Sequence, residues 1–364
     1  MSEKFKQIDK KYLMIIGGIA AILILIIIVA VVVRILSGPG TNYVKLEEKM
    51  ASAAEKYIKS DDHPSPEPGE STVVTTDVLI AEGYLKELNK YVKDTCSGSV
   101  TIMNNGGSAL YLPELKCSEY ATTHINTRLI DDSLVVDGDE YESGLYEDNG
   151  EYIFKGKSVN NYVSLGGQIW RVLKIDADGN LRLISNTHEN KKVRWDYKYN
   201  SEAKKNYGIN DYENSELLET LNASYAKFKE QNKKHLIAHD VCVGKRSSSD
   251  YSLDISIDCA EKLEKQYIGT INSVDYAMAS LDENCTSINS GSCRNYNYLS
   301  SNFAVSWSTT ALSDNSYEAI LIGNGYVNNI RTDKKYNYYW VIYLSGQESY
   351  KSGTGTLADP YVIK

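Results

Sequence analysis

The feature that most constrains this chain is an uncharged apolar segment near its N-terminus. Residues 12–33, YLMIIGGIAAILILIIIVAVVV, span 22 positions without a charged side chain. A helix rising ~1.5 Å per residue would make this segment about 33 Å long, enough to cross a hydrocarbon core of ~30 Å. Cleavable secretion signals have a shorter apolar part, usually ~7–15 residues, and end in an Ala-x-Ala site that is missing here. The sequence therefore predicts one uncleaved transmembrane helix, with membrane lipid as its partner.

Charge and cysteine placement predict which side of the membrane each part occupies. Four lysines lie in residues 1–11, the predicted cytoplasmic tail, and three basic residues follow the apolar segment closely: Arg34, Lys45 and Lys49. Because basic residues are retained on the cytoplasmic side, this excess predicts a cytoplasmic N-terminus and an extracellular bulk. All six cysteines lie in that bulk, and an even number of cysteines suits an oxidising compartment. Both observations predict a single-pass protein of the cell membrane.

The cysteines are the candidate site residues. Six cysteines can pair in several ways. If each cysteine bonds to its nearest neighbour in the sequence, the pairs are Cys96–Cys117, Cys242–Cys259 and Cys285–Cys293. Closing the last two loops contributes roughly 2.5–3.5 kcal/mol each in the chain-entropy model. That is a large share of a domain stability of ~5–15 kcal/mol. We therefore predict structural disulfides rather than redox-active thiols.

The charge balance argues against nucleic acid as a partner. The chain carries −9 in total, but residues 1–34 carry +3, so the remainder carries −12. Binding to DNA or RNA needs clustered lysine and arginine, so we predict no nucleic-acid partner. The composition also includes 29 Tyr against 4 Phe. Tyrosine-rich surfaces suit partner recognition, although composition drift and ordinary strand propensity explain the same excess.

The first part of the bulk predicts two helices and a hairpin. Apolar residues recur at helical spacing over 42–59, and three prolines within 60–72 predict an extended link. A short helix is expected after Asp77, ending near Gly83. Two strands are expected around the Asn104–Gly107 turn, with Cys96 and Cys117 at their outer ends.

This part resembles the pilin-like surface proteins of Gram-positive bacteria. The resemblance is carried by KLEEKMASAAEKYI (45–58), TTDVLIAEGYLKEL (75–88), CSGSVTI (96–102) and LPELKC (112–117). It implies a small α+β module over residues 41–125. Type IV pilins carry a Gly followed by Phe-Thr-Leu-Ile-Glu for cleavage and assembly. Here Tyr12-Leu13-Met14 stands instead, which implies an ordinary anchor.

The second part predicts short strands and one long helix. Residues 126–150 are acidic and weakly patterned, which predicts a connector with few contacts, so that a fragment of residues 146–364 should fold alone. Beyond it, the segments 152–154, 161–165, 168–175 and 181–185 are strand-like, and Asp178-Gly179 predicts a turn between the last two. A helix is expected after Asn214 or Ser215, with one apolar face: Leu217, Leu218, Leu221, Tyr225 and Phe228.

Residues 150–363 resemble a widespread domain of bacterial surface proteins, similar in pattern to sulfatase-modifying-factor and C-type-lectin-like folds. The matching segments are 150–185, 213–222, 267–280, 306–310 and 353–363. In relatives an Arg-Pro precedes the penultimate strand, whereas this chain has Tyr339-Trp340. The predicted fold class is therefore α+β: a transmembrane helix, the pilin-like module, and a lectin-like mixed domain over 151–364 with short antiparallel strands.

No segment carries a specific catalytic or cofactor motif. His235 and His239 have the i, i+4 spacing of a zinc pair, but Leu236 replaces the glutamate that a zinc hydrolase needs. Residues 176–180, DADGN, lack the glycine and glutamate positions of a calcium loop and suit a β-turn. We therefore predict no catalytic, cofactor-binding or metal-binding residue.

Three functions are consistent with these features. The favoured one is binding or adhesion at the cell surface, with a glycan or a protein as the ligand. The alternatives are an extracytoplasmic enzyme on a sulfatase-modifying-factor-like fold, or a structural subunit of a membrane or pilus-like assembly. Because one fold hosts many functions, a deep cleft with pKa-shifted groups would favour the enzyme, and shallow Tyr- and Asn-rich loops the adhesin.

Overall fold

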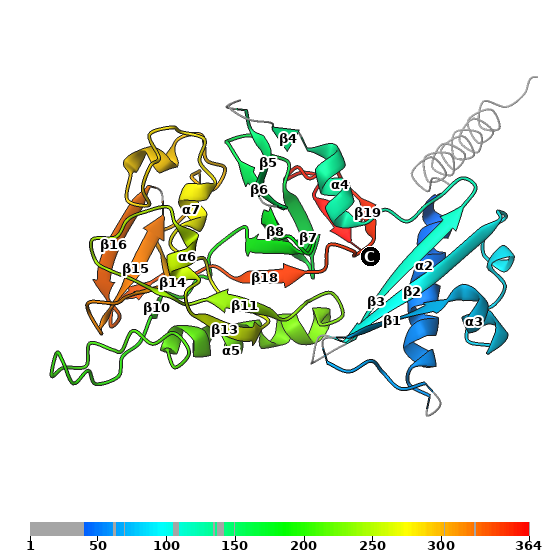
Figure 1. The fold of residues 1–364 in the computed structure, drawn as a ribbon, viewed down its shortest axis with the longest axis horizontal. Helices are drawn as coiled ribbons and strands as arrows, with labels where there is room; N and C mark the ends of the chain where they lie inside the picture. Colours follow the sequence, from blue (N-terminus) through cyan, green and yellow to red (C-terminus); the bar gives the residue numbers. More distant parts are fainter. Residues whose placement is uncertain are drawn as a thin grey trace, which may run out of the picture.

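The computed structural model describes residues 40–60, 63–68, 70–104, 109–133, 135–136, 142–148, 150–301, 303–323 and 325–363. The predicted membrane segment, residues 12–33, lies outside these ranges. Within them, no helix combines the length and the hydrophobicity needed to cross a membrane. The described residues form a small N-terminal module, from α2 to β3, and a larger distal domain, from α4 to β20 (Figure 1).

The N-terminal module is an antiparallel sheet covered by a helix. Its elements are α2 (Gly40–Tyr57), β1 (Ser71–Thr75), α3 (Thr76–Ala81), the 3₁₀ helix η1 (Leu88–Lys90), β2 (Cys96–Asn104) and β3 (Ala109–Cys117). The strands lie in the order β1-β2-β3, and α2 packs on β2 and β3. Leu46, Met50 and Ala54 on α2 are fully buried, so the amphipathic helix predicted over 42–59 is confirmed.

Local sequence signals set both ends of α3. The Thr75 side chain accepts a hydrogen bond from the Val78 amide, which satisfies one of the N–H groups left unpaired at a helix start. Gly83 follows the helix with φ of 79°, a left-handed conformation that glycine adopts without a Cβ clash. The predicted short helix is confirmed, with its start at Thr76.

The distal domain contains most of the strands. Its elements are α4 (Ile125–Asp132), β4 (Val135–Val136), β5 (Gly144–Asp148), β6 (Glu151–Lys155), β7 (Tyr162–Leu165), β8 (Gln168–Ile175), β9 (Leu181–Ser185), β10 (Val193–Arg194), α5 (Glu216–Asn232), β11 (His239–Cys242), β12 (Lys245–Arg246), α6 (Ile255–Asp258), β13 (Lys262–Gln266), α7 (Asp275–Met278), the 3₁₀ helix η2 (Gly291–Arg294), β14 (Ser306–Leu312), β15 (Glu318–Gly323), β16 (Tyr326–Arg331), β17 (Lys335–Tyr336), β18 (Val341–Leu344), β19 (Tyr350–Ser352) and β20 (Tyr361–Ile363).

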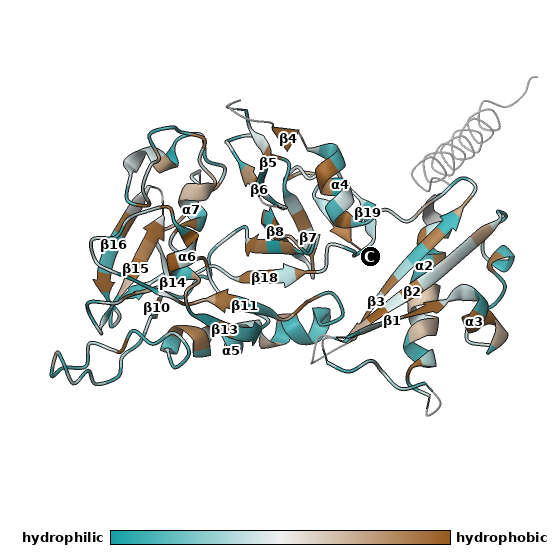
Figure 2. Cartoon of the chain, viewed as in Figure 1, coloured by the Kyte–Doolittle hydropathy of each residue, from teal (hydrophilic) through white to brown (hydrophobic). Residues whose placement is uncertain are grey.

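The distal strands form four sheets. The principal sheet runs β19-β20-β7-β8-β6-β5-β4, with β9 also paired to β8 and β18 paired to β9. A second sheet has the order β12-β14-β15-β16, and the pairs β10-β17 and β11-β13 form two-stranded sheets. Figure 2 shows hydrophobic residues gathered on β8 and β15, whereas many connecting loops are hydrophilic.

Helix α5 packs its predicted apolar face on the principal sheet. The Ser215 hydroxyl accepts a hydrogen bond from the Leu218 amide at 3.0 Å, so Ser215 is the N-terminal cap, one of the two residues predicted for that position. All five residues of the predicted face are buried. The Phe228 ring lies 5.3 Å from the ring of Trp170 on β8, centroid to centroid. The helix and its orientation are therefore confirmed.

The described parts of residues 126–150 belong to the distal domain and do not form a separate connector. Ile125 and Leu129 on α4 and Leu145 on β5 are fully buried in the distal core, and β5 pairs with β6 along its whole length. The acidic side chains that suggested a connector, such as Asp131 and Glu147, are exposed. In this segment only a few apolar residues lie between many acidic ones, so the sequence does not show the alternation that is typical of a strand.

Strand β3 contributes to both hydrophobic cores. Leu115 packs in the core of the N-terminal module. Leu110 and Leu112 belong to the core of the distal domain, and Met103 on β2 packs against it. The two parts are therefore joined through side chains as well as through the chain.

The predicted α+β class with a lectin-like distal domain is wrong. Strands account for 35% of the structure and helices for 20%, so several sheets, tied by three disulfides, dominate the molecule. The physical reason is that short pairs such as β10-β17 need only two residues per strand. Segments that short carry no periodic pattern and cannot be recognised from sequence.

Candidate functional site

A cleft of about 680 Å³ opens in the distal domain. Residues of β6, β8, β9, β11, β13, β18, α6 and α7 line it. Strand β11 lies beside β18 (Figure 1), and isolated β-bridges link Leu236 to Leu344 and Gly269 to Val341. The volume lies in the range of small-ligand sites, ~300–1,000 Å³. We call this feature the β11 cleft.

A bidentate ion pair between Arg182 and Asp275 lies in the cleft wall. Arg182 Nη2 donates to Asp275 Oδ2 at 2.7 Å, and Nη1 donates to the other carboxylate oxygen. Both side chains are only 10% exposed, and the Asn272 amide also donates to Asp275 Oδ2, at 2.9 Å. Burial alone would lower the pKa of Arg182, but the Asp275 carboxylate outweighs it and raises that pKa. The Arg182 guanidinium is therefore held in its charged form.

The His239 ring stacks on the ring of Tyr343, which comes from β18. The ring centroids lie 3.3 Å apart with an interplanar angle of 18°. Burial, together with the nearby cations of Arg182, Lys174 and Lys262, lowers the pKa of His239 to about 3. All three cations line the same cleft. The imidazole is therefore neutral at physiological pH.

The low pKa of His239 predicts acid destabilisation. In the unfolded chain a histidine has a pKa of ~6.5, so the unfolded state binds this proton more readily over the window from about pH 6.5 down to 3. Stability contributed by neutral His239 is thus complete above pH 6.5 and is lost as the pH falls. When the pH falls from 7 to 4.5, the free energy of unfolding of the wild type should decrease by about 2 kcal/mol more than that of His239→Phe, a variant that keeps a ring over Tyr343. Urea unfolding of residues 41–364 at both pH values measures this difference, and equal pH dependence in the two proteins would contradict it.

Two buried hydroxyl groups in the cleft lining have no partner among the described residues. Thr270 and Thr309 are each 1% exposed, and neither Oγ1 atom makes a hydrogen bond there. An unsatisfied buried hydroxyl costs about 1–3 kcal/mol, and buried polar groups are normally satisfied. The wall of the cleft therefore contains two hydroxyls that the described protein residues leave without a partner, both of them buried behind its surface.

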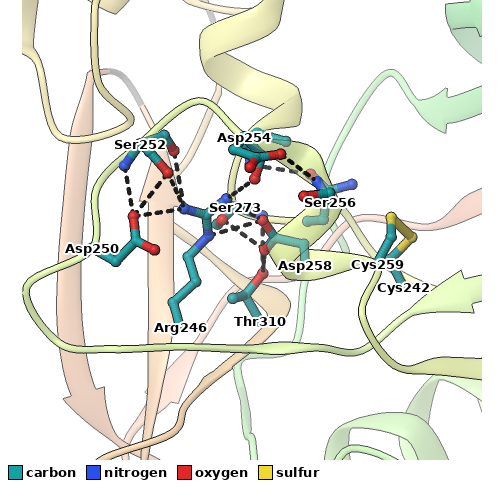
Figure 3. Close-up of polar contacts among 12 residues, drawn as sticks. Cys242, Arg246, Asp250, Ser252, Asp254, Ser256, Asp258, Cys259, Ser273 and Thr310 are labelled. Carbon is teal, nitrogen blue, oxygen red and sulfur yellow. Dashed lines mark hydrogen bonds and ion pairs between the residues drawn. A yellow bond between two sulfur atoms is a disulfide. The ribbon is translucent and has the colours of Figure 1, made fainter.

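A buried network behind the cleft wall is centred on Asp258 of α6 (Figure 3). Arg246 on β12 donates from Nε to Asp258 Oδ2 at 2.8 Å, and its Nη2 donates to the same oxygen. Ser273 Oγ donates to Asp258 Oδ1 at 2.8 Å, and Thr310 Oγ1 donates to the same oxygen. Arg246 and Asp258 are both 0% exposed. The carboxylate is thus satisfied on both oxygens.

The same arginine ties the loop between β12 and α6. Arg246 Nη2 donates to the Asp254 carbonyl at 2.6 Å, and Nη1 donates to the Ser252 carbonyl at 3.0 Å. The residue that follows Asp258 is Cys259, which lines the β11 cleft together with Cys242. The network therefore positions a part of the cleft wall, and its groups are too fully engaged to act on a ligand.

The structure pairs all six candidate cysteines as predicted. The bonds are Cys96–Cys117, Cys242–Cys259 and Cys285–Cys293, and no cysteine is free. The first bond joins opposite residues of β2 and β3. The second closes the segment that carries Arg246 and Asp258. The disulfide-bonded character of the chain is confirmed.

The other sequence candidates are dispersed. His235 contacts Glu348, with Nδ1 3.1 Å from Oε2, whereas His239 stacks on Tyr343, and α5 ends at Asn232 before both histidines. The Asp176 side chain accepts hydrogen bonds from the amides of Asp178 and Asn180, which confirms the predicted turn between β8 and β9.

One group with metal-ligand proximity occurs within the described ranges, Asp94 with Cys96 and Cys117. Its two sulfur atoms are joined in a disulfide, so they are not thiolate ligands.

Sequence reasoning misses the β11 cleft because its residues come from distant segments. Arg182, His239, Asp275 and Tyr343 lie on four different elements, and no motif relates them. The one available signal was the pair His235 and His239, whose spacing suggested a helix end. Comparison with known proteins adds no relative: no family model, no curated protein and no solved structure matches the chain. The pilin-like and lectin-like family relationships therefore stay predictions, although the fold class expected from them is wrong.

Proposed function

We propose that the chain is an extracytoplasmic binding protein, attached to the membrane through residues 12–33, and that its β11 cleft takes the saccharide end of a glycan. The observation that carries this proposal is the pair of unsatisfied hydroxyls, Thr270 and Thr309, buried in the wall of a cleft of about 680 Å³, where a ligand would reach them by rotation of the two side chains. A saccharide supplies hydroxyl groups that both donate and accept hydrogen bonds. The stacked rings of His239 and Tyr343 add the aromatic surface common in ligand pockets.

The state of the charged groups favours binding over catalysis. A general acid or base works best with a pKa near the operating pH, but His239 is held neutral by a pKa of about 3. Asp275 is engaged by Arg182 and by the Asn272 amide. Shifted pKa values in a cleft often mark an enzyme. Here the shift moves His239 away from the pH range in which it could exchange protons.

The three disulfides support the proposed location. Such bonds persist in oxidising compartments and are rare in the reducing cytosol, and all six cysteines are paired. The extracellular orientation and the membrane attachment rest on the sequence, because residues 12–33 lie outside the described ranges.

The test is a glycan array probed with the full chain in detergent micelles, followed by titration of the strongest hit. The double variant Thr270→Val and Thr309→Val removes both hydroxyls with little change of shape, so it should fold normally. Losing two hydrogen bonds of ~0.5–1.5 kcal/mol each should weaken binding roughly tenfold. Thr95→Val, at an exposed position on the N-terminal module, is the control and should bind like the wild type. An unchanged Kd in the double variant, or chemical turnover of the bound glycan, would refute the binding proposal.

A further inference from the structure

Positive charge gathers on one loop of this acidic chain. Residues 191–205 contain six basic and two acidic side chains, a charge of +4 in a chain whose total is −9. Four of the basic residues are exposed lysines in two adjacent pairs, Lys191 with Lys192 and Lys204 with Lys205. None of the four makes an ion pair within the described residues. We call residues 191–209 the basic loop.

Buried polar side chains hold the basic loop in a defined shape. Asp196 is 2% exposed, and its Oδ2 accepts hydrogen bonds from the amides of Lys198 and Ile209, at 3.2 and 2.7 Å. Asn200 is 3% exposed and donates to the Gly208 carbonyl at 3.0 Å. These contacts close both ends of the loop, so its exposed lysines project from an ordered backbone.

A close approach to the neighbouring strand fixes the returning arm of the loop. Gly208 has φ of 85°, and a Cβ there would lie 2.2 Å from Thr332 Oγ1 and 2.6 Å from the Asp196 carbonyl. Only glycine fits that position. Thr332 Oγ1 also donates to the Tyr207 carbonyl at 2.7 Å. The loop is therefore docked on the segment that carries two further exposed lysines, Lys334 and Lys335.

Exposed tyrosine rings lie among these cations. Tyr197 is 47% exposed and Tyr199 is 60% exposed. The Arg194 guanidinium lies 4.4 Å from the ring centre of Tyr197, and that of Arg331 lies 3.9 Å from the ring centre of Tyr207. Stacking of this kind orients each guanidinium along a ring. The surface thus combines flat apolar faces with positive charge.

From these features we propose that the basic loop binds an anionic polysaccharide, at a site separate from the β11 cleft. Lysine ammonium groups match carboxylate or sulfate groups repeated along a chain, and tyrosine rings stack on the C–H faces of sugars between them. The loop extends from the end of the molecule opposite α2 (Figure 1), so it points away from the membrane to which residues 12–33 are proposed to attach. A polymer outside the cell fits this geometry better than the cell's own lipid surface. The choice of polysaccharide over nucleic acid rests on the proposed extracytoplasmic location.

The test compares polymers of known charge on the full chain in a neutral detergent. Hyaluronate supplies repeated carboxylates, dextran sulfate supplies sulfates, uncharged dextran is the negative control, and single-stranded DNA is the competing class. We expect binding to the two charged polysaccharides, weakening as salt rises, and none to dextran. Replacing the four lysines of the two adjacent pairs, Lys191, Lys192, Lys204 and Lys205, by alanine should weaken that binding roughly tenfold or more.

Two controls separate this site from general charge and from the cleft. Lys90→Ala with Lys93→Ala removes two exposed lysines from the N-terminal module and should have much less effect than Lys204→Ala with Lys205→Ala, which removes the same charge from the loop. The Thr270→Val and Thr309→Val variant should bind both charged polysaccharides normally, so the two proposals fail independently. Equal weakening by the two lysine pairs would refute the loop as the site. Tighter binding of DNA than of either polysaccharide would refute the ligand class.

Discussion

Replacing Asp258 by alanine should destabilise residues 41–364 by about 3–5 kcal/mol, the range for breaking one side of a buried ion pair. The substitution leaves the Arg246 guanidinium, 0% exposed, without its carboxylate. Ser273 Oγ and Thr310 Oγ1 lose an acceptor as well. Urea unfolding under oxidising conditions measures the change in the free energy of unfolding.

The matched control for this substitution is Asp250→Ala. Asp250 also contacts Arg246, at 3.4 Å, but its side chain is 30% exposed. Water screens such a pair, so the expected loss is below ~1 kcal/mol. The double variant Arg246→Met with Asp258→Leu should be more stable than Asp258→Ala alone, because no unpaired charge stays buried. A loss below ~1 kcal/mol for Asp258→Ala would show that the network is not a stabilising centre.

Removing residues before 146 should abolish cooperative folding of the distal domain. The fragment 146–364 lacks Ile125, Leu129 and Leu145, all fully buried in the distal core. A buried side chain of this kind contributes about 1.5–3 kcal/mol, so the combined loss is comparable with a whole domain stability of ~5–15 kcal/mol. The sequence-based expectation that this fragment folds alone is thereby reversed. Calorimetry of the oxidised fragment should show no sharp unfolding transition.

The control fragment is residues 118–364, which keeps α4 and β5. It should unfold cooperatively, at a lower temperature than residues 41–364, because the contacts of Leu110 and Leu112 with the distal core are lost. If 146–364 and 118–364 unfold alike, then α4 and β5 are dispensable, and the connector predicted from the acidic sequence would be the better description.

Features determined by neighbouring residues could be predicted from the sequence. The cap and the five apolar residues after it are close together in the sequence, so spacing identifies the buried face and narrows the cap to Asn214 or Ser215. The turn at Asp178-Gly179 and the end of α3 at Gly83 depend on residues a few positions apart. The cysteine pairs are also local, with separations of 21, 17 and 8 residues.

Features determined by distant residues could not be predicted. β4 pairs in parallel with β5 through only two residues, and β20 pairs in parallel with β7, far away in the sequence. Leu145 is the only apolar residue of β5 that is fully buried, and two acidic residues end the strand. The sequence of β5 therefore resembles that of an acidic loop. The β11 cleft depends on such pairings, because β18 places Tyr343 opposite Arg182.

Net charge describes the surface incompletely for a related reason. The net charge of the whole chain combines the positive charge of the basic loop with the negative charge of acidic segments elsewhere. Only the fold shows that Asp196 is buried while the lysines of the loop are exposed. Exclusion of polyanionic partners on total charge therefore does not hold for each part of the surface.

The pairing of β18 with β9 also imposes an order of events during synthesis. A chain that emerges from its N-terminus delivers β9 long before β18 exists, and β7 long before β20. Each disulfide, by contrast, joins cysteines that emerge close together in time. Oxidation can thus cross-link three local segments while the principal sheet still lacks its C-terminal strands, and those strands complete it last.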